Sequence, residues 1–155
     1  MAYAADAIEF ITRLSTDTLL LGLLLFGFFV STIYFGKNLG ISFIFSLFVS
    51  NFLYTRIPFD LPLENAWYEF GTIVLVALLV SMVLKRFIVS EFSYKKSKKY
   101  TQSIIISILV VITLMTTGLT EAYTFAPFIS RWFTGDFQFW ASLVPFVVLF
   151  FVIKK

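Results

Sequence analysis

The stretch TLLLGLLLFGFFVSTIYFG, residues 18–36, decides the fold class because it runs for 19 residues without a charged side chain. An α-helix rises 1.5 Å per residue, so about 20 apolar residues cross the roughly 30 Å hydrocarbon core of a bilayer. Runs of similar length recur along the chain. The long uncharged gaps are Thr18–Gly36, Asn38–Thr55, Phe70–Leu84, Tyr100–Thr120 and Phe137–Ile153. This pattern predicts an all-α, polytopic helical membrane protein.

The composition of the whole chain agrees with that class. Of its 155 residues, 59% are hydrophobic and 14% are charged, against about 45–50% and about 25% in a soluble domain. A globule of this size would have to expose large apolar patches to water. The chain has no Cys and no His, which excludes disulfides, thiolate nucleophiles and imidazole bases or ligands. We therefore expect no catalytic site, no cofactor and no metal site.

We expect five transmembrane helices. The third contains two basic residues, and the second has an alternative form. Lys85 and Arg86 can lie inside the third span if their charged ends reach back to the interface. The second segment could instead form a re-entrant hairpin, which would leave four spans; we prefer five because the segment is long enough to cross. The expected spans are residues 18–36, 39–55, 69–90, 100–120 and 137–153.

The distribution of lysine and arginine predicts the orientation in the cell (cytoplasmic) membrane. Six basic residues lie between Lys85 and Lys99, and such loops stay on the cytoplasmic side. The C-terminal Lys154 and Lys155 then lie on the same side. With five spans the N-terminus is outside, and with a re-entrant second segment it is inside. The three tryptophans fall at the outer ends of spans, as in an interfacial aromatic belt; they are Trp67, Trp132 and Trp140.

Residues 1–16 differ from a span and form the first of two expected units. Ala4, Ile8 and Ile11 fall on one helical face, with charged residues elsewhere, so we expect an amphipathic helix on the membrane surface. Asp17 is expected to cap the helix that follows it. Residues 17–155 form a single helical membrane domain. The run from Gly36 to Gly40 is expected to be a tight cytoplasmic turn.

Two rows of hydroxyl side chains are the strongest candidates for a functional role. They recur at spacings of three and four residues, so each row occupies one face of a helix. Such faces serve helix packing, and a hydroxyl can return its hydrogen bond to the carbonyl one turn back. The alternative is that the rows line a pore. The rows are Ser42, Ser46 and Ser50, and Thr113, Thr116, Thr117 and Thr120.

The basic loop is the strongest charge cluster. Its four central lysines are expected to contact anionic lipids of the inner leaflet, where each basic residue contributes about 1 kcal/mol. We expect no nucleic-acid partner, because the retention of basic loops on the cytoplasmic side of a membrane already accounts for these lysines. The four residues are Lys95, Lys96, Lys98 and Lys99.

The first 90 residues or so resemble the colicin V production protein family, small bacterial inner-membrane proteins with several spans. The resembling features are Asp17 before the first span, the turn Gly36-Lys37-Asn38-Leu39-Gly40, and the span Phe70–Phe87 entering a basic loop. The chain departs from the family at Ile104-Ile105-Ile106, where glycines would be expected, and in its fifth span. The resemblance implies an accessory membrane role connected with secretion or the envelope, without catalytic residues.

The function expected from these features is that of a non-enzymatic accessory or scaffold subunit of a membrane, envelope or secretion assembly. Small-residue faces without intramembrane charge favour helix packing, with copies of the same chain or with a larger membrane partner. The alternative is a homo-oligomeric channel or small-solute pathway lined by the two hydroxyl rows, which would give little ion selectivity.

Overall fold

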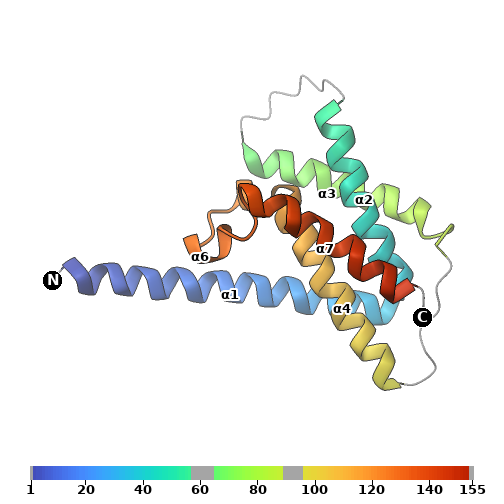
Figure 1. Ribbon diagram of the computed structural model, residues 1–155, viewed down its shortest axis with the longest axis horizontal. Coiled ribbons are helices and arrows are strands. Elements are labelled where there is room, and N and C mark those ends of the chain that lie inside the picture. The colour runs from blue at the N-terminus through green and yellow to red at the C-terminus, as the bar shows by residue number, and fades with distance from the viewer. Residues whose placement is uncertain (1, 57–64, 89–95, 154–155) are drawn as a thin grey trace.

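A computed structural model of the chain describes residues 2–56, 65–88 and 96–153, with side chains for 8–54, 65–88 and 98–151. Within these ranges all the regular secondary structure is helical, which confirms the all-α class. The elements, drawn in Figure 1, are α1 (Ala2–Phe35), α2 (Lys37–Arg56), α3 (Ala66–Leu84), α4 (Lys96–Leu114), the π-helical turn η1 (Met115–Leu119), α5 (Thr120–Ala122), α6 (Pro127–Ser130) and α7 (Asp136–Ile153).

Three helical stretches of the described chain are long and apolar enough to cross a membrane by their length and composition. They are Ile8–Phe35, Ala66–Leu84 and Lys98–Ala122, and Asp136–Phe151 is a shorter apolar helix. These stretches fit the helical membrane class. The helix α2 is outside this set, and its lysine, asparagines and serines lower its mean hydropathy.

The long helices alternate in direction, as Figure 1 shows. The C-terminal ends of α1, α3 and α7 lie toward the same side of the molecule as the N-terminal ends of α2 and α4. The stretch Lys98–Ala122 is the most buried of the three long apolar stretches, with 67% of its apolar window inside the bundle against 6% for Ile8–Phe35. Much of the core comes from α2 and α4, through residues such as Ile41, Ile44, Leu47, Ile106, Val110 and Leu114.

The junction between α1 and α2 depends on two glycines. Gly36 has φ of +86°, a backbone conformation that glycine adopts without steric cost, and it alone separates the two helices. The turn expected from Gly36 to Gly40 is therefore confined to Gly36, because residues 37–40 already belong to α2. Gly40 has another role, because it lies buried inside α2. A Cβ atom there would stand 2.5 Å from Ile106 Cγ2 and 3.4 Å from Thr32 Oγ1, so Gly40 lets α2 approach α4 and α1 closely.

The expected helix start at Asp17 is wrong, because α1 is continuous from Ala2 to Phe35. No proline or glycine interrupts its first 20 residues, and Arg13 forms an ion pair of 2.9 Å with Glu9 one turn earlier. Hydroxyls in this part bond to carbonyls of the preceding turn, as Thr16 does to Thr12 at 2.9 Å. These local contacts favour helix on both sides of Asp17.

The third span was expected to continue to residue 90, but its helix ends at Leu84. The helix α3 stops at Leu84, and a turn follows it. The amides of Arg86 and Phe87 bond to carbonyls only three residues back, at 3.1 and 2.9 Å, which is the tightened pattern of a helix that is ending. Lys85, Arg86 and Phe87 are exposed. Lys85 and Arg86 therefore follow the helix and do not lie within its apolar run.

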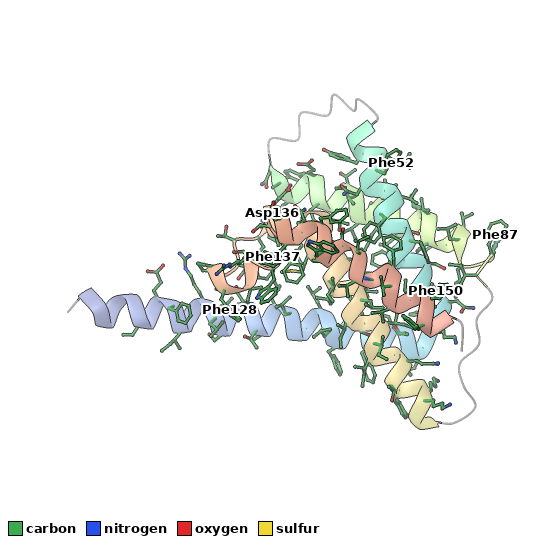
Figure 2. The ribbon with its side chains drawn as sticks, viewed as in Figure 1. Phe52, Phe87, Phe128, Asp136, Phe137 and Phe150 are labelled. Atoms are coloured by element: carbon green, nitrogen blue, oxygen red, sulfur yellow. The ribbon has the colours of Figure 1, made fainter. Side chains whose placement is uncertain are left out.

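Bulky apolar side chains cover the outer surface of the bundle. On α3, Ile73, Ala77 and Ser81 are buried at a spacing of four residues, and Leu75 and Leu79 are exposed. Figure 2 shows Phe52, Phe87 and Phe150 at the periphery of the molecule, and all three are more than half exposed. Such a surface is unfavourable in water and suits contact with lipid or with another apolar helix.

Candidate functional site

The serine row of α2 is buried inside the bundle. The hydroxyl of Ser42 donates to the carbonyl of Asn38 at 2.6 Å, and the hydroxyl of Ser46 donates to the carbonyl of Ser42 at 2.7 Å. Ser50 is also buried, and its hydroxyl has no partner among the described residues. Two of the three hydroxyls are therefore engaged by their own helix.

The threonine row follows the same pattern up to the point where α4 becomes π-helical. Thr113 donates to Leu109 O at 2.8 Å, which is the expected bond to the previous turn. Thr116 and Thr117 donate to carbonyls three residues back, and Thr120 donates to the carbonyl of Met115, five residues back. The first three threonines are buried and Thr120 is half-buried. All four threonine hydroxyls therefore donate to carbonyls of the continuous helical stretch from α4 to α5.

A polar cavity of about 210 Å³ lies where α2, α3, η1, α5 and α7 meet. Its lining is rich in amide, hydroxyl and carboxylate groups, and none of its described lining residues is basic. The polar lining residues are Asn51, Tyr54, Glu69, Thr116, Thr117, Glu121 and Gln138. The cavity therefore favours a small polar or cationic molecule over an anion. It contains two members of the threonine row and no member of the serine row.

The π-helical turn shapes this cavity. Within η1, Gly118 has φ of +128°, which is unfavourable for any residue with a Cβ atom. One wide turn shifts the register of the helix, and such bulges are frequent at functional sites. From α7, Gln138 Nε2 donates to Thr116 O at 3.3 Å, so the side chain from another helix satisfies a carbonyl of the bulge.

The acids of the cavity come from separate elements. Glu69 lies in the first turn of α3 and is half-buried, and Tyr54 of α2 lines the same cavity. Glu121 comes from α5 and is exposed. Of the residues that the structure describes, no three His, Cys, Asp or Glu side chains gather closely enough to hold a metal ion. The arrangement offers binding by hydrogen bonds and charge.

Asp17 is the second polar centre of the molecule, and it is only 1% exposed. Its carboxylate accepts a hydrogen bond from the Tyr123 hydroxyl at 3.0 Å and another from the Ala126 amide at 2.7 Å. Asp17 therefore connects the segment before α6 to the middle of α1 by hydrogen bonds. It does not cap the N-terminus of the helix in which it lies. The hydrogen bond to Asp17, together with burial, raises the pKa of the Tyr123 hydroxyl.

An apolar groove lies on one flank of the bundle, where the turn after α6 meets α4 and α7. It has a volume of about 460 Å³ and is lined by Ile112, Trp132, Phe133, Phe137, Trp140, Ala141 and Val144. A smaller cavity of about 230 Å³ adjoins it, shares Trp132 and Phe137 with it, and adds Phe128 and Arg131. Two of the three tryptophans of the expected aromatic belt therefore line this groove.

The lysines expected to contact anionic lipids are only partly described. Lys98 is exposed and Lys99 is half-buried, both in the first turns of α4. Lys95 and the side chain of Lys96 lie outside the described residues. The C-terminal lysines are outside these residues too.

Sequence reasoning identified some residues of the polar cavity and missed how they assemble. Thr116 and Thr117 were candidates from their spacing. Asn51 and Gln138 lie near helix ends, and nothing in their local sequence indicates that they face one another. The role of Asp17 depends on partners more than 100 residues away.

The comparisons with known proteins add no family to this description. No protein-family model matches the chain, and neither the curated proteins nor the solved structures include a match.

Proposed function

We propose that the chain is a multi-pass protein of the cytoplasmic membrane with five spans, formed by α1, α2, α3, the α4–α5 unit and α7. The alternating directions of these helices support this arrangement (Figure 1). Lys37, Lys85, Arg86, Lys98 and Lys99 occupy helix ends on one side of the bundle. In the proposed orientation that side is cytoplasmic, because basic residues are retained there.

The helix α2 crosses the membrane as an inner helix in this proposal. Its low hydropathy does not oppose that position, because lipid does not contact most of its polar side chains. Ser42, Ser46 and Ser50 are buried, and Lys37 is 4% exposed. The most extensive backbone contact in the bundle is between α2 and α3. Helices that pack inside a bundle tolerate small polar residues well.

The proposed function is that of a non-enzymatic accessory or scaffold subunit of a membrane, envelope or secretion assembly. The observation that carries this proposal is that small polar side chains lie inside the bundle and bulky apolar side chains lie on its outer surface. Most hydroxyls of the serine and threonine rows are buried inside the bundle. The outer faces of α1, α3 and α7 present bulky apolar residues such as Leu19, Leu79 and Phe150. The resemblance to colicin V production proteins leads to the same class of role. In this proposal one of those outer faces packs against another copy or against a larger membrane protein.

Cross-linking tests this function, because the natural chain has no cysteine. Single cysteines replace Leu19 on α1, Leu79 on α3 and Phe150 on α7, and each variant is oxidised in native membranes. A packing face gives a disulfide-linked dimer at one position and not at the other two. A heterologous partner gives instead a constant larger particle in gentle detergent. A monodisperse monomer without cross-links at any position contradicts the proposal.

The polar cavity favours a second candidate, a pathway or binding chamber for a small polar solute. Thr116 and Thr117 line the cavity together with two carboxylates. Purified protein in liposomes distinguishes the two functions. Flux of water, glycerol or ions above that of empty liposomes supports the pathway, and flux equal to that of empty liposomes eliminates it.

A further inference from the structure

We propose that the flank formed by α4, α7 and the turn after α6 is a specific site for an anionic phospholipid, with its phosphate on Arg131 and one acyl chain in the apolar groove. This inference rests on the membrane location proposed above. It assigns a ligand to two cavities that neither the accessory function nor the polar cavity uses.

The shape of the site fits a molecule with a polar head and an apolar tail. The two cavities adjoin, since Trp132 and Phe137 line both of them. The larger one, about 460 Å³, falls within the range of about 300–1,000 Å³ typical of ligand pockets. Its lining is aromatic and aliphatic throughout. Phe137 lies in the first turn of α7 and Phe128 lies in α6, and Figure 2 labels both on this flank of the molecule.

The charge of the site selects the head group. Among the described residues, Arg131 is the one charged residue that lines either cavity. It is exposed, and none of the described carboxylates forms an ion pair with it. A guanidinium group offers a planar set of donors that matches phosphate oxygens. An anionic lipid such as phosphatidylglycerol is favoured over zwitterionic phosphatidylcholine, because the latter carries a compensating cation next to its phosphate.

The position of the tryptophans supports a lipid rather than a soluble ligand. Trp132 and Trp140 line the groove and are 56% and 67% exposed. Exposed tryptophans of this kind are typical of the boundary between head groups and acyl chains. Beyond the groove, Val147 and Phe151 of α7 are exposed. An acyl chain leaving the groove along α7 would therefore remain on apolar surface.

The fluorescence of the groove tryptophans tests the proposal. The full chain with Trp67→Phe keeps only Trp132 and Trp140, and it is reconstituted in phosphatidylcholine liposomes. Brominated phosphatidylglycerol or brominated phosphatidylcholine is then added in increasing mole fraction, because bromine quenches tryptophan on contact. We expect half-maximal quenching at about a fivefold lower mole fraction of phosphatidylglycerol, the preference that one basic residue near a surface provides.

Two variants in the same Trp67→Phe background separate the head from the tail. Arg131→Gln should abolish the preference for phosphatidylglycerol. Arg13→Gln is its matched control, because Arg13 is also exposed but pairs with Glu9 at 2.9 Å, and it should retain the preference. Ala141→Leu reduces the volume of the apolar groove and should weaken quenching by both lipids without changing their ratio.

Each outcome decides the proposal. Equal quenching by the two lipids in the parent chain overturns it, and so does an equal effect of Arg131→Gln and Arg13→Gln. Weak quenching by both lipids shows that another protein or a second copy fills the groove, and this also overturns it. Flotation of the chain with liposomes tests membrane insertion separately. A chain that does not float overturns both the lipid site and the membrane location, whereas a floating chain without lipid preference overturns the site alone.

Discussion

Replacement of Gly40 by alanine tests the close approach of α2 to α4. The new Cβ atom would stand 2.5 Å from Ile106 Cγ2 and 3.4 Å from Thr32 Oγ1. Ile106 is completely buried, so its methyl group cannot turn toward lipid. Overpacking of this kind costs about 1–3 kcal/mol. We therefore expect Gly40→Ala to destabilise the bundle by that amount.

The chain provides a matched control for this change. Gly22 lies in α1 with nothing within 4 Å of its added Cβ atom. Gly22→Ala introduces the same methyl group into a helix without a clash, and alanine favours helix over glycine by about 1 kcal/mol. It should leave stability unchanged or raise it slightly. Both variants are unfolded in mixed micelles by increasing mole fractions of SDS, with tryptophan fluorescence as the readout.

A second substitution shows whether the clash is the cause. Ile106→Leu removes the Cγ2 methyl and conserves volume, a change that costs less than about 1.5 kcal/mol. In the double variant the two changes should be non-additive, with part of the loss from Gly40→Ala recovered. The reasoning is refuted if Gly40→Ala is as stable as Gly22→Ala, or if the two costs simply add.

Three further predictions concern the polar groups. Asp17→Ala should cost about 1–3 kcal/mol because it leaves the buried Ala126 amide without its acceptor, and SDS unfolding measures the loss. The hydroxyl of Tyr123 has a raised pKa, so its bond to Asp17 contributes stability below the unfolded pKa of about 10 and loses it as pH rises through the higher folded value. Unfolding at pH 9 to 11 should therefore show a decline that Tyr123→Phe lacks, and equal slopes would contradict this bond. Ser46→Leu should destabilise the bundle through overpacking because Ser46 is buried, while Thr18→Leu on the exposed face of α1 should not. Loss of liposome permeability in a stable Ser46→Leu variant would favour the pore instead.

Local sequence signals predicted the parts of the fold that depend on local physics. Uncharged runs indicated the helices, because lipid imposes a minimum apolar length. Gly36 was correctly expected in a turn, since glycine accepts positive φ. The hydroxyl of Thr113 bonds to the carbonyl one turn back, as its position within a helix predicted.

The errors arise where distant contacts decide the structure. Asp17 has the composition of a helix cap, but its partners Tyr123 and Ala126 come from the other end of the chain. The register shift at Gly118 has no local signal as strong as a proline. The polar cavity needs five elements to be in place before Asn51, Glu69 and Gln138 can face it. Single-sequence patterns contain no information about such assemblies.

Labelling of single cysteines in intact cells tests the five-span membrane arrangement most directly. The natural chain has no cysteine, so Ala2→Cys and Ser97→Cys each give one reactive position, before α1 enters the bundle and at the beginning of α4 respectively. A membrane-impermeant maleimide should label Ala2→Cys in intact cells and Ser97→Cys only after permeabilisation. Labelling of Ser97→Cys in intact cells would contradict the proposed orientation, and protection of Ala2→Cys would contradict five spans.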